Sequence, residues 1–162
     1  MVKTRGKKRN IRSQDVGIFK CFISSKAAWE RQQNFEKGSK NTLPKNIEII
    51  DAKVRISDLR RAITNLTSNA CRESDKIEIS LIKKEKYANI IIDDNGPGIN
   101  EKDYSSVFKA FYRIESSRNL STGGLGLGLT IARDIARSHG GEIKLEKSPL
   151  GGLRAILLIP IS

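Results

Sequence analysis

The strongest chemical signal in the sequence is a glycine-rich stretch at residues 122–129, which holds four glycines within six positions and leads into a helical pattern. Glycine can adopt positive φ and leaves backbone N–H groups open to a ligand. The start of a helix adds a partial positive charge and unpaired N–H donors. These features favour a site for a polyphosphate, or a loop that covers one. A flexible linker is the alternative, but Gly/Ser linkers do not interleave leucines in this way.

Three polar side chains share one face of a predicted helix. Asn65, Asn69 and Arg72 follow one another at i, i+4 and i+7, and their face lies about 120° from the apolar stripe of the same helix. Asparagine favours caps and turns over helix interiors. Two asparagines in successive turns therefore indicate a binding role, with an ordinary solvated face as the alternative.

An acidic pair, Asp93-Asp94, ends an apolar run and is followed by the turn residues Asn95-Gly96-Pro97-Gly98. A carboxylate at a strand end, next to a glycine-rich turn, is well placed to face a ligand. A plain turn is the alternative, because Asp, Asn, Gly and Pro are the residues that turns prefer.

The elements that must position these groups follow from hydrophobic periodicity. The apolar residues Leu59, Ile63, Leu66 and Ala70 predict a helix that begins at a Ser57 or Asp58 cap. The pattern also predicts a helix, or a helix followed by a strand, at 16–35. It further predicts strands at 46–50, 53–56, 76–83, 87–93, 142–146 and 153–159, a short helix at 101–107, and a helix at 127–139. Tight turns between strands favour an α+β two-layer sandwich, with a mostly antiparallel sheet and helices on one face.

Composition narrows the class of protein. A chain of 162 residues with 38% hydrophobic and 30% charged residues is typical of a soluble globular domain, and no apolar run approaches the length of a membrane span. The two cysteines are far apart and predict free thiols. Six Lys/Arg in residues 1–12 contribute to a net charge of +12. Nucleic-acid binding through this tail is a rival hypothesis, but no recognition motif supports it.

Four motifs in order resemble the ATP-binding catalytic domain of sensor histidine kinases, within the gyrase/Hsp90/histidine-kinase/MutL superfamily. Residues 65–70 resemble the N box, 94–98 the first glycine box, 108–113 the F box and 124–129 the second glycine box. The resemblance covers roughly residues 46–160. The sequence at residues 149–155, 111–113 and 117–118 is most similar to the EnvZ-type osmosensor kinases.

The resemblance implies a role for each motif. Asn69 supplies an oxygen ligand to the Mg²⁺ that bridges the ATP phosphates. Asn65, the second catalytic residue, supports Asn69 from one turn earlier, and Arg72 reaches a phosphate. Asp94 accepts the adenine amino hydrogen. The other implied nucleotide-binding residues are Gly96, Gly98, Ile99, Phe108, Arg113, Gly124, Leu125, Gly126, Leu127, Gly128 and Leu129, of which those from Arg113 onward act as a lid.

One position bears on the reaction type. Hydrolytic relatives carry a glutamate that orients water where this sequence has Asn65. A neutral amide cannot take a proton near pH 7. The site is therefore expected to hold ATP for transfer of the γ-phosphoryl to a histidine, instead of hydrolysing it quickly.

The sequence departs from the family in its acceptor. Its single histidine, His139, is expected to be structural, and residues 1–45 leave no room for a dimerisation hairpin. We expect a fragment of a longer kinase, or one acting in trans on a histidine-bearing dimerisation domain or partner kinase, with a response regulator downstream. The expected organisation is a disordered basic tail at 1–14, a helical or linker segment at 15–45 and the ATPase domain at 46–162. The expected location is the bacterial cytoplasm, with full-length relatives anchored in the inner membrane. Leu125, where the family usually has Thr or Ser, keeps open the alternative of a degenerate nucleotide- or partner-binding module.

Overall fold

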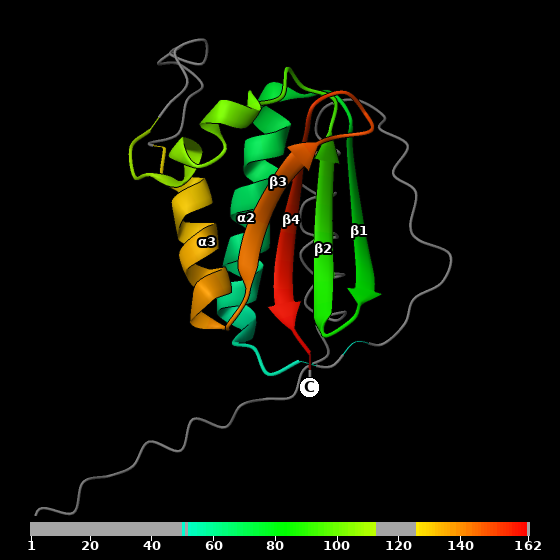
Figure 1. The fold of residues 1–162 in the computed structure, drawn as a ribbon, viewed down its shortest axis with the longest axis vertical. Coiled ribbons are helices and arrows are strands. Elements are labelled where there is room, and N and C mark those ends of the chain that lie inside the picture. The colour runs from blue at the N-terminus through cyan, green and yellow to red at the C-terminus, as the bar shows by residue number, and fades with distance from the viewer. Residues whose placement is uncertain (1–49, 51, 113–125, 162) are drawn as a thin grey trace, which may run out of the picture.

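A four-stranded antiparallel sheet forms one layer of the domain (Figure 1). The computed structural model describes residues 50, 52–112 and 126–161. The strands run in the order β1-β2-β4-β3, and each neighbouring pair is antiparallel. Their bounds are β1 Ile77–Lys84, β2 Tyr87–Asp94, β3 Glu142–Lys147 and β4 Leu153–Pro160. The four strands predicted between residues 76 and 159 are thereby confirmed.

The register of the sheet places apolar side chains of neighbouring strands together on one face. Ile79 lies opposite Ile92, and Ile90 lies opposite Leu157. Because successive side chains of a strand point to opposite faces, these residues share the inner face, where Ile90, Ile92 and Leu157 are at most 1% exposed. Burying each such side chain stabilises the fold by roughly 1.5–3 kcal/mol. This face is the centre of the core.

Two helices cover that face and form the second layer, α2 (Ile56–Glu73) and α3 (Gly128–Ser138) (Figure 1). The predicted stripe of α2 is buried in the core. In α3 the buried residues are Ala132 and Ala136, whose small side chains let it pack closely on α2. The α+β two-layer sandwich is therefore confirmed. Within the described residues, no helix is long and apolar enough to cross a bilayer.

Three local predictions were wrong. Residues 53–55 form no strand and Ile56 already begins α2; Ala52 and Val54 are instead buried in the core. Neither Ser57 nor Asp58 caps the helix. The N-cap is Arg55, without a side-chain cap, and Asp58 pairs with its guanidinium. The helix predicted at 101–107 is instead two short 3-10 turns, η1 (Glu101–Asp103) and η2 (Ser106–Phe108). The segment 16–35 and residues 46–49 lie outside the described residues, so their predicted elements stay predictions.

His139 ties the end of α3 to the beginning of α2. The backbone N–H of Arg55 donates to His139 Nε2 at 3.1 Å. The other ring nitrogen, Nδ1, lies 2.8 Å from the carbonyl oxygen of Ile135. This arrangement requires the neutral tautomer with its proton on Nδ1, because Nε2 must accept. The expectation of a structural histidine agrees with this geometry.

Replacing His139 tests the tie. We expect His139→Leu to lower the free energy of unfolding by about 1 kcal/mol, because the Arg55 N–H and the Ile135 carbonyl both lose a partner. Urea unfolding followed by circular dichroism measures the change. Ser138→Ala is the comparison and should cost less: it removes contacts of the hydroxyl with Arg55 at 3.5 Å, the Ile135 carbonyl at 2.8 Å and His139 Nδ1 at 3.1 Å, but it keeps the bond between the Arg55 N–H and His139 Nε2. An equal loss in both variants would contradict a specific role for the imidazole.

Candidate functional site

Asn65 lies where α2 meets the start of α3. Its Nδ2 is buried and has no hydrogen-bond partner among the residues that the structure describes. Gly128, the first residue of α3, lies against it, so that an added Cβ there would stand 3.9 Å from Asn65 Cβ. Asn69 follows one turn later on the same face and is half-buried. A buried donor without a partner costs free energy, and this nitrogen keeps its capacity to donate to a ligand.

The start of α3 is shaped by Gly126. Its φ of +72° is a left-handed conformation, and an added Cβ would come within 2.9 Å of the Tyr112 carbonyl oxygen. Phe111 donates its N–H to the Gly126 carbonyl at 3.1 Å. No acidic residue occupies the first turn of α3, so the partial positive charge of the helix start is not offset by its own side chains.

Asp94 ends β2 as a buried carboxylate that is 6% exposed. Its Oδ1 accepts from the Gly96 N–H at 2.9 Å and from the Leu153 N–H at 3.0 Å. Within the described part of the chain both hydrogen bonds of this carboxylate go to Oδ1. Oδ2 thereby keeps its capacity to accept from a ligand.

The turn after Asp94 is joined to the end of α2. Asn95 Oδ1 accepts from the backbone N–H groups of Asp75 and Lys76, at 3.1 and 2.9 Å, in the connection between α2 and β1. Gly98 has a φ of +72°. Figure 1 shows the end of β2, the β3–β4 turn and the start of α3 at the same end of the molecule. The first glycine box and the described part of the second, residues 126–129, are thus brought to the same end of the sandwich, with Gly128 against Asn65.

Phe108 is anchored on α3 by two residues that the sequence alone did not single out. Thr130 Oγ1 donates to the Phe108 carbonyl at 2.8 Å, and the Arg133 guanidinium lies 4.4 Å from the centre of the Phe108 ring. Arg133 also pairs with Glu142 at 2.8 Å. The signal was available, since Thr130 and Arg133 are polar residues at i, i+3 on a helix that is otherwise apolar on its inner side.

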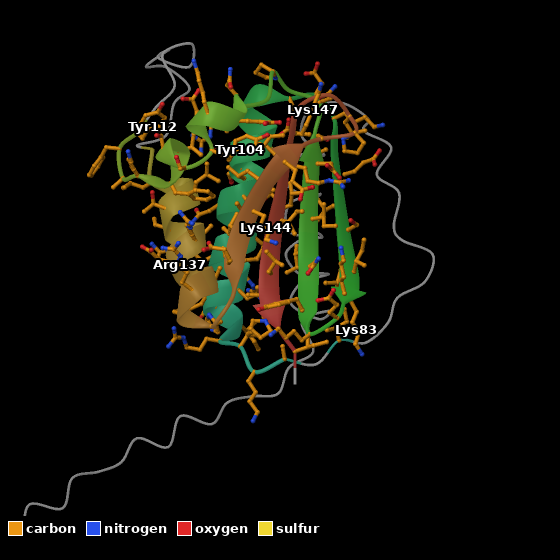
Figure 2. All side chains as sticks on the ribbon, viewed as in Figure 1. Lys83, Tyr104, Tyr112, Arg137, Lys144 and Lys147 are labelled. Carbon is orange, nitrogen blue, oxygen red and sulfur yellow. The ribbon has the colours of Figure 1, made fainter. Side chains whose placement is uncertain are left out.

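Tyrosine and lysine side chains line the same end (Figure 2), where Tyr104, Tyr112 and Lys147 lie. Burial raises the pKa of Tyr104, and the nearby carboxylates of Glu101 and Glu146 raise it further. Its phenol therefore stays protonated and able to donate a hydrogen bond at neutral pH.

The remaining predicted site residues are less closely held. Arg72 is exposed, and its Nε donates a long 3.3 Å hydrogen bond to the Ser68 carbonyl of its own helix. Ile99, Leu127 and Leu129 are half-buried. Arg113, Gly124 and Leu125 lie outside the described residues, so their roles stay predictions.

A family comparison matches this arrangement. Residues 55–162 match the model of the family described as histidine kinase-, DNA gyrase B- and HSP90-like ATPase. The chain belongs to this ATPase family. The resemblance inferred from the four motifs is thereby confirmed.

Individual relatives of this ATPase domain are bacterial sensor kinases. The sensor histidine kinase CpxA of Escherichia coli strain K12 is 39% identical over 104 residues, which cover 64% of this chain and 23% of CpxA. The chain thus spans about a quarter of the length of that relative. The solved ATP-binding domain of PrrB from Mycobacterium tuberculosis superposes with a TM-score of 0.71 at 26% identity, over 91% of this chain and 96% of that one. The histidine kinase domain of the E. coli osmosensor EnvZ gives a TM-score of 0.63 at 25% identity, over 96% and 93%. The domain is therefore an ATPase domain of the sensor histidine kinase type.

The ion pair that supports Phe108 predicts a pH dependence for this ATPase domain. The hydrogen bond from Arg133, with further bonds from the Ile143 N–H and Arg137, lowers the pKa of Glu142 from 4.5 to about 2. A pKa lowered by folding contributes stability that is present above pH 4.5 and is lost as the pH falls toward 2. We expect Glu142→Gln to cost about 1 kcal/mol at pH 7, discounted because the side chain is partly exposed, and the cost to shrink below pH 4.5.

Urea unfolding at several pH values between 7 and 2.5 measures this difference. The matched control is Glu78→Gln, which removes the exposed pair with Lys76 and is expected to cost less at pH 7. A cost for Glu142→Gln that stays constant down to pH 2.5 would contradict the assignment.

Proposed function

We propose that this domain binds ATP with Mg²⁺ at the end of the sandwich where α2 meets α3, and transfers the γ-phosphoryl to a histidine on another domain or chain. The observation that carries the proposal is the buried Asn65 Nδ2, which has no hydrogen-bond partner among the described residues and belongs to a side chain that lies against the first residue of α3. A polar group in that position, next to a helix start without acidic residues, suits a polyphosphate.

The residues present fit the metal and the nucleotide. Mg²⁺ prefers hard oxygen ligands and keeps waters and phosphate oxygens around it, so one amide oxygen from Asn69 suits such a site. When bound, the ion would neutralise charge on the phosphates. Arg72 can leave its long hydrogen bond at little cost and reach a phosphate. Asp94 Oδ2 would accept the amino hydrogen of adenine.

The reaction that suits these residues is group transfer. Asn65 is a neutral amide and cannot act as a general base toward water. The incoming nucleophile would be an imidazole nitrogen of the acceptor: a P–N bond forms to the γ-phosphorus as the bond to the ADP oxygen breaks. The protein contributes position and charge, as in other phosphoryl transfers.

The acceptor histidine is proposed to come from elsewhere. His139 Nε2 accepts from the Arg55 N–H, and His139 follows the last residue of α3. An α-helix of 11 residues spans roughly 16 Å, so His139 lies far from the start of α3. By analogy with the sensor kinases that it resembles, the partners would be a histidine-bearing dimerisation domain and a response regulator in the bacterial cytoplasm.

Metal-dependent binding tests the first half of the proposal. We expect wild type to bind a fluorescent ATP analogue at least tenfold more tightly with Mg²⁺ than with EDTA, and Asn69→Ala to lose that gain, because the ion loses its protein ligand. Ser68→Ala, an exposed neighbour on α2, is the control and should keep the gain. The proposal would be contradicted if the wild-type protein did not bind the analogue, or bound it equally well with and without Mg²⁺.

Asn65 tests the reaction type. We expect Asn65→Glu to raise the basal ATPase rate about tenfold or more, because a carboxylate can orient and deprotonate water. Asn65→Gln has nearly the same shape but no base and should stay at the wild-type rate. The release of phosphate measures both.

Transfer itself is measured as acid-labile phosphate on a purified histidine-bearing helical hairpin of a sensor kinase. Phosphate on that hairpin supports the proposed kinase. Nucleotide binding without any transfer would instead indicate a degenerate nucleotide-binding module.

A further inference from the structure

The turn between β3 and β4 packs directly on the buried carboxylate of Asp94. Gly152 donates its N–H to the Asp94 carbonyl at 3.1 Å, and Leu153 donates its N–H to Asp94 Oδ1 at 3.0 Å. An added Cβ at Gly152 would stand 2.1 Å from Asp94 Oδ1 and 2.6 Å from the Gly96 nitrogen. No real Cβ could occupy that position, so only glycine lets the turn come this close.

These contacts fix the orientation of the carboxylate. The backbone N–H of Gly96, after β2, and the backbone N–H of Leu153, the first residue of β4, converge on the same oxygen. Charge-assisted bonds of this kind are about twice as strong as neutral ones. Rotation of the Asp94 side chain would break both hydrogen bonds. Oδ1 is therefore held by the protein, and Oδ2 is the oxygen that can accept from a ligand.

A second set of contacts holds the turn in place from the neighbouring residue. Asp93 is buried and accepts two bonds from Arg154, Nε to Oδ1 and Nη2 to Oδ2, each at 2.8 Å. Ser148 Oγ donates to the same carboxylate at 3.0 Å and accepts the Leu150 N–H at 3.1 Å. The Asp93 charge is thereby paired, and the β3–β4 turn is tied to the end of β2.

We propose that the Gly152–Leu153 backbone, supported by the Asp93–Arg154 pair, is a positioning element that selects a purine bearing a 6-amino group. It holds Asp94 so that a single anionic acceptor, Oδ2, meets the base. An amino group donates to that oxygen, whereas a base with hydrogen at C6 leaves it unpaired and a 6-carbonyl repels it. The inference rests on the proposed nucleotide site and adds residues outside its four motifs.

The test compares ATP with purine riboside triphosphate, which lacks the 6-amino group and keeps the phosphates. We expect wild type to prefer ATP by roughly tenfold or more, the loss of one hydrogen bond to a charged group. Gly152→Ala displaces the carboxylate and should bring the ratio of the two Kd values toward one. The gain from Mg²⁺ should persist, because it depends on the phosphate end. A purely structural role would weaken both nucleotides alike and leave the ratio unchanged.

Gly151→Ala is the matched control in the same turn. Gly151 has a φ of +106°, so alanine is strained there, but its Cβ would have nothing within 4 Å. We expect it to keep the wild-type ratio. If Gly152→Ala does not fold by circular dichroism, Arg154→Gln replaces it and should lower the ratio, with Arg154→Lys recovering part of it.

The outcomes separate this inference from the proposed function. If wild type binds ATP with Mg²⁺ but does not discriminate, or if Gly152→Ala and Arg154→Gln keep the full ratio, the positioning element is overturned and the nucleotide site stands. If wild type binds neither nucleotide, both fail. A ratio that falls in Gly152→Ala and not in Gly151→Ala supports the inference.

Discussion

The pairing of β2 with β4 is the constraint on which the rest of the domain depends. It joins two hairpins that are far apart in the sequence, with Asp93 opposite Arg154 and Ile90 opposite Leu157. Because the pairing is antiparallel, the end of β2 meets the beginning of β4. The same register that closes the apolar core therefore brings Asp94 against Gly152. Core packing and the geometry of the site are consequences of one alignment, and a slip of one residue would move every inward side chain outward.

The alternation of a strand also explains why two neighbouring carboxylates have different partners. Asp94 follows Ile90 and Ile92 on the inner face, where backbone N–H groups satisfy it. Asp93 faces the other way and meets a guanidinium. Each is buried, and each is compensated by the donors available on its own side of the sheet. Two adjacent acids thus avoid competing for the same donors.

The sequence predicted the regular elements well where periodicity was strong. The β1 and β2 bounds differ from the predicted ones by a residue or so, and α3 begins one residue after Leu127. It failed where tertiary contacts override local preference: Val54 is buried but belongs to no strand, and Arg55 is the N-cap of α2 without a side-chain capping bond.

The candidate site, too, could be predicted only in part from the sequence. The asparagine face and Asp94 were found because their residue types are unusual for their elements. Other residues act through contacts that residue type does not reveal. Gly152 lacks the Cβ that would clash with Asp94, Leu153 donates a backbone N–H, and Arg133 packs on the Phe108 ring. They become visible only when segments distant in the chain are placed side by side.

The hydrogen bond from Phe111 to Gly126 has an evolutionary consequence. It holds Phe111 and Gly126 together beside the start of α3, although the two residues are well separated in the sequence. A loop whose ends are already joined can lengthen at small entropic cost, about 0.6 kcal/mol for each doubling. Insertions and deletions there would leave the sheet, the helices and the carboxylate at the end of β2 undisturbed. Descendants of this domain could therefore change the length of the chain between Phe111 and Gly126 while inheriting the same sandwich.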